Sequence, residues 1–167
     1  DAYKNLLNSS LTAVSDDSSS TQTPPTISGS YTKGIEAKII ITVRSTGDGG
    51  YFSTSSVPSG IVSGTGTISS TIPQPIGDSG LYIKFANTQT NQQTWNINLP
   101  NKAASNYDSN YTAYQNALDN KEKVVKNADL TIAQNNKKMD ELYRPDELEL
   151  RSKQLVIRQK QDALTDA

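Results

Sequence analysis

The stretch Ala37-Lys-Ile-Ile-Ile-Thr-Val43 is the strongest structural signal in this sequence. It is a continuous run of β-branched residues, which pack well on a pleated strand and restrict helix formation. Polar residues do not alternate with apolar ones here, as they would in a strand with one face in water. We therefore expect a strand that is buried on both faces, or nearly so.

Two further segments alternate in the manner of half-buried strands. In Leu81–Phe85 the residues Leu81, Ile83 and Phe85 share one face, and in Thr94–Leu99 the residues Trp95, Ile97 and Leu99 do the same. The weaker runs complete a sandwich of six or seven strands: Ser28–Tyr31, Tyr51–Ser56 and Gly66–Ile72. The glycine clusters at 47–50 and 77–80 are predicted to form tight turns between strands.

The composition changes sharply near Pro100. All ten glycines lie between Gly29 and Gly80, whereas 22 of the 33 charged residues follow Pro100. Glycine and proline punctuate strands and turns, while a glycine-free segment rich in Lys, Glu, Gln, Ala and Leu propagates helix. The predicted fold class is α+β, with a small antiparallel β-sandwich between a short N-terminal helix and a C-terminal helical coiled coil or hairpin.

Four segments follow from this division. Residues 1–14 carry an apolar stripe at helical spacing and should pack on the start of the C-terminal helix, because 14 residues are marginal as an isolated helix. Residues 15–26 have almost nothing to bury and form a linker, flexible and then extended. The sandwich covers residues 27–100, and residues 105–166 form the helical segment.

The helical segment carries a regular 4-3 repeat, the pattern of a left-handed coiled coil. Two polar residues interrupt it, Lys121 and Asn135, and polar seam residues commonly fix register or oligomeric state. The apolar repeat predicts an assembly seam made of Tyr107, Tyr111, Tyr114, Leu118, Val125, Ile132, Met139 and Leu142, with Ala128 also in the repeat.

The helix should break near Pro145, because proline lacks a backbone donor and restricts the residue before it. Asp146 and Glu149 then resemble a capping box that starts a second helix. Two arrangements fit this break: an antiparallel hairpin, which the fresh cap favours, or one long kinked rod.

The overall composition excludes several functional classes. The chain has 167 residues, is only 34% hydrophobic, and contains no His and no Cys. This removes the commonest general base, the thiolate nucleophile, disulfides and the usual zinc ligands. A net charge of −1 and the lack of a long apolar run give no reason to expect nucleic-acid binding or membrane insertion. Because the chain starts at Asp1, we expect a processed protein or a piece of a longer one.

The β segment offers few candidates for chemistry, so we expect no enzymatic activity, no cofactor and no metal. Its carboxylates after the linker are Glu36, Asp48 and Asp78, and the last two lie in the predicted turns rather than across a cleft. Trp95 shares a face with Ile97 and Leu99 and is predicted to lie in the core. Possible glycan contacts are Tyr51, Phe52 and Tyr82.

Four stretches of the β segment carry a resemblance to a known group of proteins. They are Pro25-Thr-Ile-Ser-Gly-Ser-Tyr-Thr-Lys-Gly34, Ile41-Thr-Val-Arg-Ser-Thr-Gly47, Gly80-Leu-Tyr-Ile-Lys-Phe85 and Thr94-Trp-Asn-Ile-Asn-Leu-Pro100. The pattern resembles β-sandwich inserts in bacteriophage tail, baseplate and neck proteins, and less closely those in flagellar filament-capping proteins. The resemblance covers about 75 residues and implies an oligomer on a coiled-coil stem; no catalytic residue belongs to it.

These observations lead to two hypotheses. The first is a non-enzymatic structural component of a phage virion or similar extracellular appendage, which oligomerises through its helices and contacts other structural proteins of the assembly. The second is a carbohydrate-binding adhesion module on a helical stalk, which recognises host surface glycans. Both place the protein in a virion or outside the cell.

Overall fold

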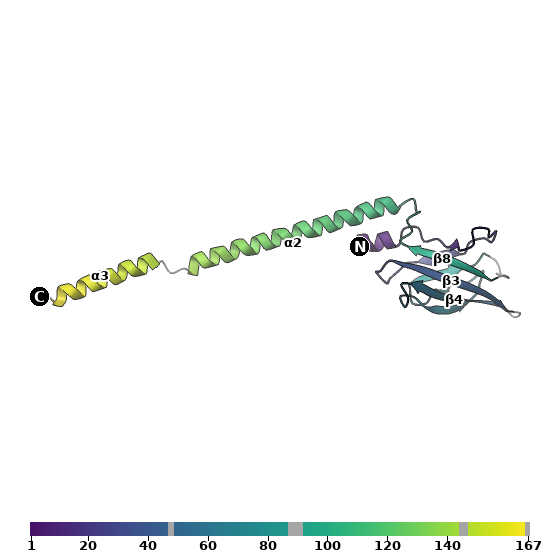
Figure 1. Ribbon diagram of the computed structural model, residues 1–167, viewed down its shortest axis with the longest axis horizontal. Helices are drawn as coiled ribbons and strands as arrows, with labels where there is room; N and C mark the ends of the chain where they lie inside the picture. The colour runs from purple at the N-terminus through teal and green to yellow at the C-terminus, as the bar shows by residue number, and fades with distance from the viewer. Residues whose placement is uncertain (47–48, 87–91, 144–146, 166–167) are drawn as a thin grey trace. The chain divides into compact units, whose positions relative to one another are not determined.

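The computed structural model describes residues 1–46, 49–86, 92–143 and 147–165. The chain divides into two compact units, Asp1–Leu118 and Asp119–Ala167. The first unit contains a short helix and two antiparallel sheets, and the second is helical (Figure 1). The predicted α+β class and the β-sandwich are therefore confirmed.

The sandwich consists of a five-stranded and a three-stranded sheet. The larger sheet has the strand order β1-β8-β3-β4-β5, and the smaller has the order β2-β7-β6. The strands of the larger sheet are β1 (Val14–Ser15), β3 (Ala37–Thr46), β4 (Gly49–Val57), β5 (Gly64–Thr67) and β8 (Gln93–Leu99). Those of the smaller sheet are β2 (Thr26–Gly29), β6 (Gln74–Pro75) and β7 (Leu81–Lys84).

The β-branched run forms β3, which lies in the middle of the larger sheet between β8 and β4. Its inward-facing residues Ile39, Ile41 and Val43 are fully buried. The residues between them, Ile40 and Thr42, face outward and are half-buried. The predicted burial of β3 is thus confirmed for its inner face and only in part for its outer face.

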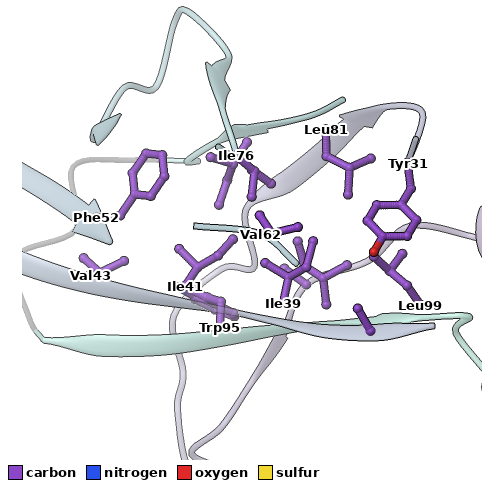
Figure 2. Packing of buried hydrophobic residues seen from close by; sticks show 14 of the residues in the cluster. Tyr31, Ile39, Ile41, Val43, Phe52, Val62, Ile76, Leu81, Trp95 and Leu99 are labelled. Atoms are coloured by element: carbon purple, nitrogen blue, oxygen red, sulfur yellow. The ribbon is translucent and has the colours of Figure 1, made fainter. Parts of the chain in front are cut away.

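The core lies between the two sheets, as Figure 2 shows for the labelled residues. Ile39 and Ile41 point from the larger sheet toward Ile76 and Leu81 in the opposite layer. Trp95 pairs with Ile41 across the β3–β8 ladder and is completely buried. The predicted core role of Trp95 is confirmed, because alternation along β8 directs it inward together with Ile97 and Leu99.

Two of the weaker strand predictions are displaced. The run predicted at Ser28–Tyr31 is strand over Thr26–Gly29. The run predicted at Gly66–Ile72 is strand only over Gly64–Thr67, although the Ile68 amide still donates to the Gly50 carbonyl at 2.9 Å. The predicted turn at residues 77–80 is present, with Gly77 and Gly80 at φ of +52° and +80°. A side chain at Gly80 would collide with the Ser30 carbonyl, so both conformation and space require glycine there. The centre of the other predicted turn, residues 47–48, lies outside the described residues.

The N-terminal helix is shorter than predicted. Helix α1 covers Ala2–Leu7 rather than residues 1–14. Its end is fixed by Asn8, whose side-chain amide donates to the Lys4 carbonyl at 2.8 Å while its side-chain oxygen accepts the Tyr31 amide at 2.7 Å. Further along, Val14 pairs with Asn96 in a strand, because the outer edge of β8 needs hydrogen-bond partners.

The segment predicted as a linker is fastened to β8, which corrects the prediction of a flexible tether over residues 15–26. The Asp16 amide donates to the Thr94 carbonyl at 3.0 Å, and the Asn96 side chain donates to the Asp16 carboxylate at 2.8 Å. The Gln93 amide group donates to the hydroxyls of Ser15 and Ser20 at 2.7 and 2.6 Å. The polar side chains that indicated a linker are the ones that make these bonds.

Two helices follow the sandwich: α2 (Tyr107–Tyr143) and α3 (Glu147–Thr165). Helix α2 runs across the boundary between the two units at Leu118. The predicted break at Pro145, the Asp146 cap and the choice between hairpin and rod depend on residues 144–146, which are outside the described residues. Within the described parts of the chain, no helix has the length and apolar character needed to cross a membrane.

Candidate assembly surface

The first turns of α2 are attached to α1, as the sequence predicted. The rings of Tyr3 and Tyr114 have centroids 5.0 Å apart. The Asn110 side chain donates to the Ser9 hydroxyl at 3.0 Å and to the Asn5 carbonyl at 3.3 Å. The seam residue Tyr114 is therefore already in contact with another segment of the same chain. The first unit extends to Leu118.

Burial of Tyr3 affects the acidity of its hydroxyl. Desolvation raises the pKa of Tyr3 above its ordinary value of 10.0, and the charges of Glu36 and Tyr114 add to this effect. A hydrogen bond with the backbone of Glu36 acts in the opposite direction. Tyr3 therefore contacts α2 through its ring and the start of β3 through its hydroxyl.

Beyond this attachment, the seam residues of the single chain are exposed. The side chains of Val125, Ile132 and Met139 are 51%, 57% and 53% exposed. At 3.6 residues per turn these three positions, seven apart, lie along one side of the helix. Leu118 begins the same row, and Leu142 at the end of α2 is also exposed. This surface, from Leu118 to Leu142, is the candidate assembly surface.

The two rows of the 4-3 repeat differ in character. Taking Leu118, Val125, Ile132 and Met139 as one row, the other row contains Lys121, Ala128 and Asn135, which are all exposed. The apolar row is thus continuous, while the second row is small or polar over three successive heptads. Such positions specify register and oligomeric state at a cost in stability.

Helix α3 carries two rows of exposed apolar residues, with the exposed Val156 between them on one side of the helix. Leu148 and Leu155 are seven residues apart, as are Leu150, Ile157 and Leu164 in sequence. The second group is displaced from the first by two residues, roughly 200° around the helix axis. A single neighbouring helix would cover one of these rows only.

The predicted glycan contacts do not form one site. Phe52 is wrong as a surface residue, since it is fully buried and its ring packs 5.9 Å from that of Phe85. Tyr51 and Tyr82 are exposed, but they alternate with inward-facing residues on β4 and β7, respectively. They therefore point outward from different sheets of the sandwich, and one ligand cannot bridge them.

The carboxylates of the β segment are not gathered into a site. Asp78 lies in the turn before β7 and forms an exposed ion pair with Lys33. The hydrogen bond from Lys33 lowers the pKa of Asp78 below its ordinary value. Glu36 is exposed at the start of β3, and Asp48 lies outside the described residues. Within the described ranges, no group of three or more metal-ligating side chains occurs.

Sequence reasoning missed one feature of the first unit, a groove where β3 begins and β4 and β8 end. Its volume is about 490 Å³, and its lining residues include Lys38, Asn98 and Lys102. Lys38 lies far from Asn98 and Lys102 in the sequence, and no local pattern marks the three residues. The strand register, which pairs Lys38 with Asn98 and with Val57, brings Lys38 to the chain segment that continues from Asn98 to Lys102.

No protein-family model, curated protein or solved structure matches this chain.

Proposed function

We propose that this protein is a non-enzymatic structural component of a phage virion, in its tail, neck or baseplate, or of a similar extracellular appendage. The helices assemble copies of the chain, and the β-sandwich is the folded module that they carry. Other structural proteins of the assembly are its further partners. The observation that carries this proposal is the candidate assembly surface, a row of apolar side chains exposed in the single chain.

Helix α2 depends on packing against a partner for its stability. Most of the stability of helices in proteins comes from packing an apolar face, not from intrinsic propensity. From Asp119 to Leu142 the side chains of α2 are exposed. Fully burying one large apolar side chain contributes about 1.5–3 kcal/mol of stability. The 4-3 spacing is suited to knobs-into-holes packing against another helix of the same kind.

The two apolar sides of α3 indicate how many helices pack together in the assembly. A helix that must cover two opposite sides needs two neighbours, as helices have in bundles of three or more. Leu148 and Leu155 would contact one neighbour, while Leu150, Ile157 and Leu164 would contact the other. This favours an assembly of more than two helices at the level of α3.

The proposal is tested by Ile132→Asp, with Leu130→Asp as its matched control. Ile132 and Leu130 are 57% and 54% exposed in the single chain and lie two residues apart on α2, but only Ile132 belongs to the repeat. Ile132→Asp would bury an unpaired charge in the seam, so we expect the oligomer to dissociate. Leu130→Asp should leave the oligomer intact.

Light scattering coupled to size exclusion gives the mass of each variant. Two results would overturn the oligomeric proposal: a monomeric unmodified chain at high micromolar concentration, or equal loss of mass in both variants. Location is tested separately, by mass spectrometry of purified extracellular particles from the source culture. The chain is expected in that fraction, and its confinement to the cell lysate would contradict an extracellular assembly.

A further inference from the structure

The two flanks of the candidate assembly surface differ in charge. Beside the apolar row lie Glu122 and Asp129, each one helical turn after a member of that row. Beside the second row lie Ala117, Val124 and Thr131, each one turn before a member of it. All five side chains are exposed in the single chain. One flank is therefore acidic and the other uncharged, so charge distinguishes the two directions in which a neighbouring helix can run.

The direction of the neighbouring helix decides which flanks meet. Between parallel copies in register, the acidic flank of one helix faces the uncharged flank of the other. Between antiparallel copies, each flank faces its own kind. The antiparallel register that overlaps the whole surface sets Leu118 against Leu142 and centres the pair near Leu130. Asp129 then faces Asp129 of the second copy, and like charges across an interface destabilise it. Parallel packing avoids this repulsion.

Lys121 needs a partner for its charge within the seam. It is exposed in the single chain, and among the described residues it makes no ion pair. In parallel packing a second-row residue inserts into a hole of four residues, one of which directly follows the same position on the neighbour. For Lys121 that residue is Glu122, and this contact between opposite charges offsets the repulsion between two copies of Lys121. In the antiparallel register Lys121 instead faces Met139, while Glu122 lies opposite Asn136.

Asn135 has the same preference for parallel neighbours. Its side-chain amide is both a donor and an acceptor, so two copies of Asn135 can hydrogen-bond to each other across a parallel seam in register. In the antiparallel register Asn135 faces the apolar side chain of Val125. Burying an amide without a hydrogen-bond partner costs free energy. Both polar residues of the second row therefore find partners in the parallel arrangement.

We propose that the copies of α2 pack parallel and in register, with Lys121 beside Glu122 of the neighbouring copy and Asn135 beside its own counterpart. This inference rests on the proposed function, because it concerns the orientation of the copies that the assembly surface brings together. Each sandwich precedes its own α2 in the chain, so parallel packing brings the sandwich-bearing ends of all helices together. An antiparallel pair would separate them.

Disulfide trapping tests the orientation, because the chain has no cysteine of its own. Val125→Cys and Met139→Cys each place one thiol in the apolar row, at positions about 21 Å apart along the helix. In a parallel assembly in register, each thiol lies next to its own counterpart and within reach of a disulfide. Oxidised glutathione should therefore link the chains of both variants, with loss of the monomer band in non-reducing gel electrophoresis.

Leu130→Cys is the matched control. Leu130 is 54% exposed in the single chain and lies outside the repeat. Its chains should be linked about tenfold more slowly or less, because only thiols that the seam holds together react at a high effective concentration. Lys121→Cys removes a charge rather than an apolar group from the seam. It gives the same reading as the other seam variants if a cysteine in the apolar row weakens the assembly.

An antiparallel assembly gives a different pattern of links. In the register that overlaps the whole surface, two copies of Val125 lie about 15 Å apart along the helices, too far for a disulfide. A shifted antiparallel register can bring one of the two tested positions next to its own counterpart, but not both. An oligomer in which only one of Val125→Cys and Met139→Cys is linked, or neither, would overturn the inference.

The contact between Lys121 and Glu122 is tested by the affinity of the assembly. Glu122→Gln should raise the dissociation constant about threefold, the effect of losing one partly exposed ion pair. Glu141→Gln makes the same change at an exposed position on the side of α2 away from the seam, and should leave the constant unchanged. In Lys121→Met the effect of Glu122→Gln should disappear. An equal effect of Glu122→Gln with and without Lys121 would contradict the pairing.

The mass of the reduced variants separates this inference from the proposed function. Light scattering under reducing conditions shows assembly whether or not a disulfide can form. If α3 of the same chain covers the apolar row, the unmodified chain and the reduced variants are all monomers, and both proposals fail. Reduced oligomers that do not form the expected links overturn the parallel orientation alone.

Discussion

The sandwich and the helical segment use the same kind of apolar pattern with opposite results. On β3 the inward residues Ile39 and Ile41 are completely buried, because β7 and the loops around it supply partners within the chain. On α2 the residues Val125 and Ile132 repeat just as regularly but are more than half exposed. Regular apolar spacing marks a face suited to packing in both regions. The sandwich finds its partner within the chain, and we propose that other copies of the chain supply the partner of α2.

The largest expected effect within one chain comes from shortening a buried side chain of β3. Ile41→Ala should lower the free energy of unfolding by about 2–5 kcal/mol, because it leaves a cavity in the core. Ile40→Ala makes the same change one residue away, on the half-buried outer face, and should cost clearly less. Denaturant unfolding followed by Trp95 fluorescence measures both.

Equal losses of unfolding free energy in Ile40→Ala and Ile41→Ala would contradict the distinction between the buried and the half-buried face of β3.

The helical signal in circular dichroism provides a second comparison between the sandwich and the helices. It should depend on protein concentration if other copies cover α2, while the unfolding midpoint reported by Trp95 should not.

A smaller effect is expected at the attachment between α1 and the sandwich. Asn8→Ala removes the partner of the Tyr31 amide and the cap of α1, and should cost about 1–3 kcal/mol. Asn5→Ala is the control, since the side chain of Asn5 is exposed and makes no hydrogen bond among the described residues. It should change the unfolding free energy by less than about 0.5 kcal/mol. A neutral Asn8→Ala would show that the N-terminal segment is not part of the folded unit.

The smallest effect is expected at the exposed pair of Lys33 and Asp78. The pKa of Asp78 is lowered from its ordinary 3.8, so its contribution to stability is present above that pH and disappears as the pH falls through the folded-state pKa. Carbon-detected magnetic resonance titration should show this lowered pKa, and Lys33→Met should return it toward 3.8.

Asp17 serves as an internal control in the same titration. Its pKa is lowered by hydrogen bonds from Ser19, which Lys33→Met does not touch. If both aspartates shifted in Lys33→Met, the variant would have changed the fold rather than one ion pair.

The sequence was sufficient for features that depend on local periodicity. The β-branched run of β3, the alternation of β8 and the burial of Trp95 follow from which side chains share a face. Phe52 follows the same rule, because it alternates with the exposed Tyr51 along β4 and faces the core.

Features that depend on long-range pairing were not predictable in this way. Val14 continues an apparent helical stripe, yet Val14 and Ser15 form a strand because β8 offers them an unpaired edge. The polar residues after them were interpreted as a linker, although their side chains bind Gln93 and Asn96. The groove with Lys38, Asn98 and Lys102 lies where β3 begins and β4 and β8 end, so Lys38 reaches it only through long-range strand pairing.

The central claim, that other copies of the chain cover the apolar face of α2, is tested most directly by comparing two masses. The intact chain and a version that ends at Leu118, which keeps the contact between Tyr3 and Tyr114, are measured by light scattering at equal concentrations. We predict an intact chain of at least two 18.1 kDa copies and a monomeric truncation. A monomeric intact chain with fully formed helices would contradict the claim.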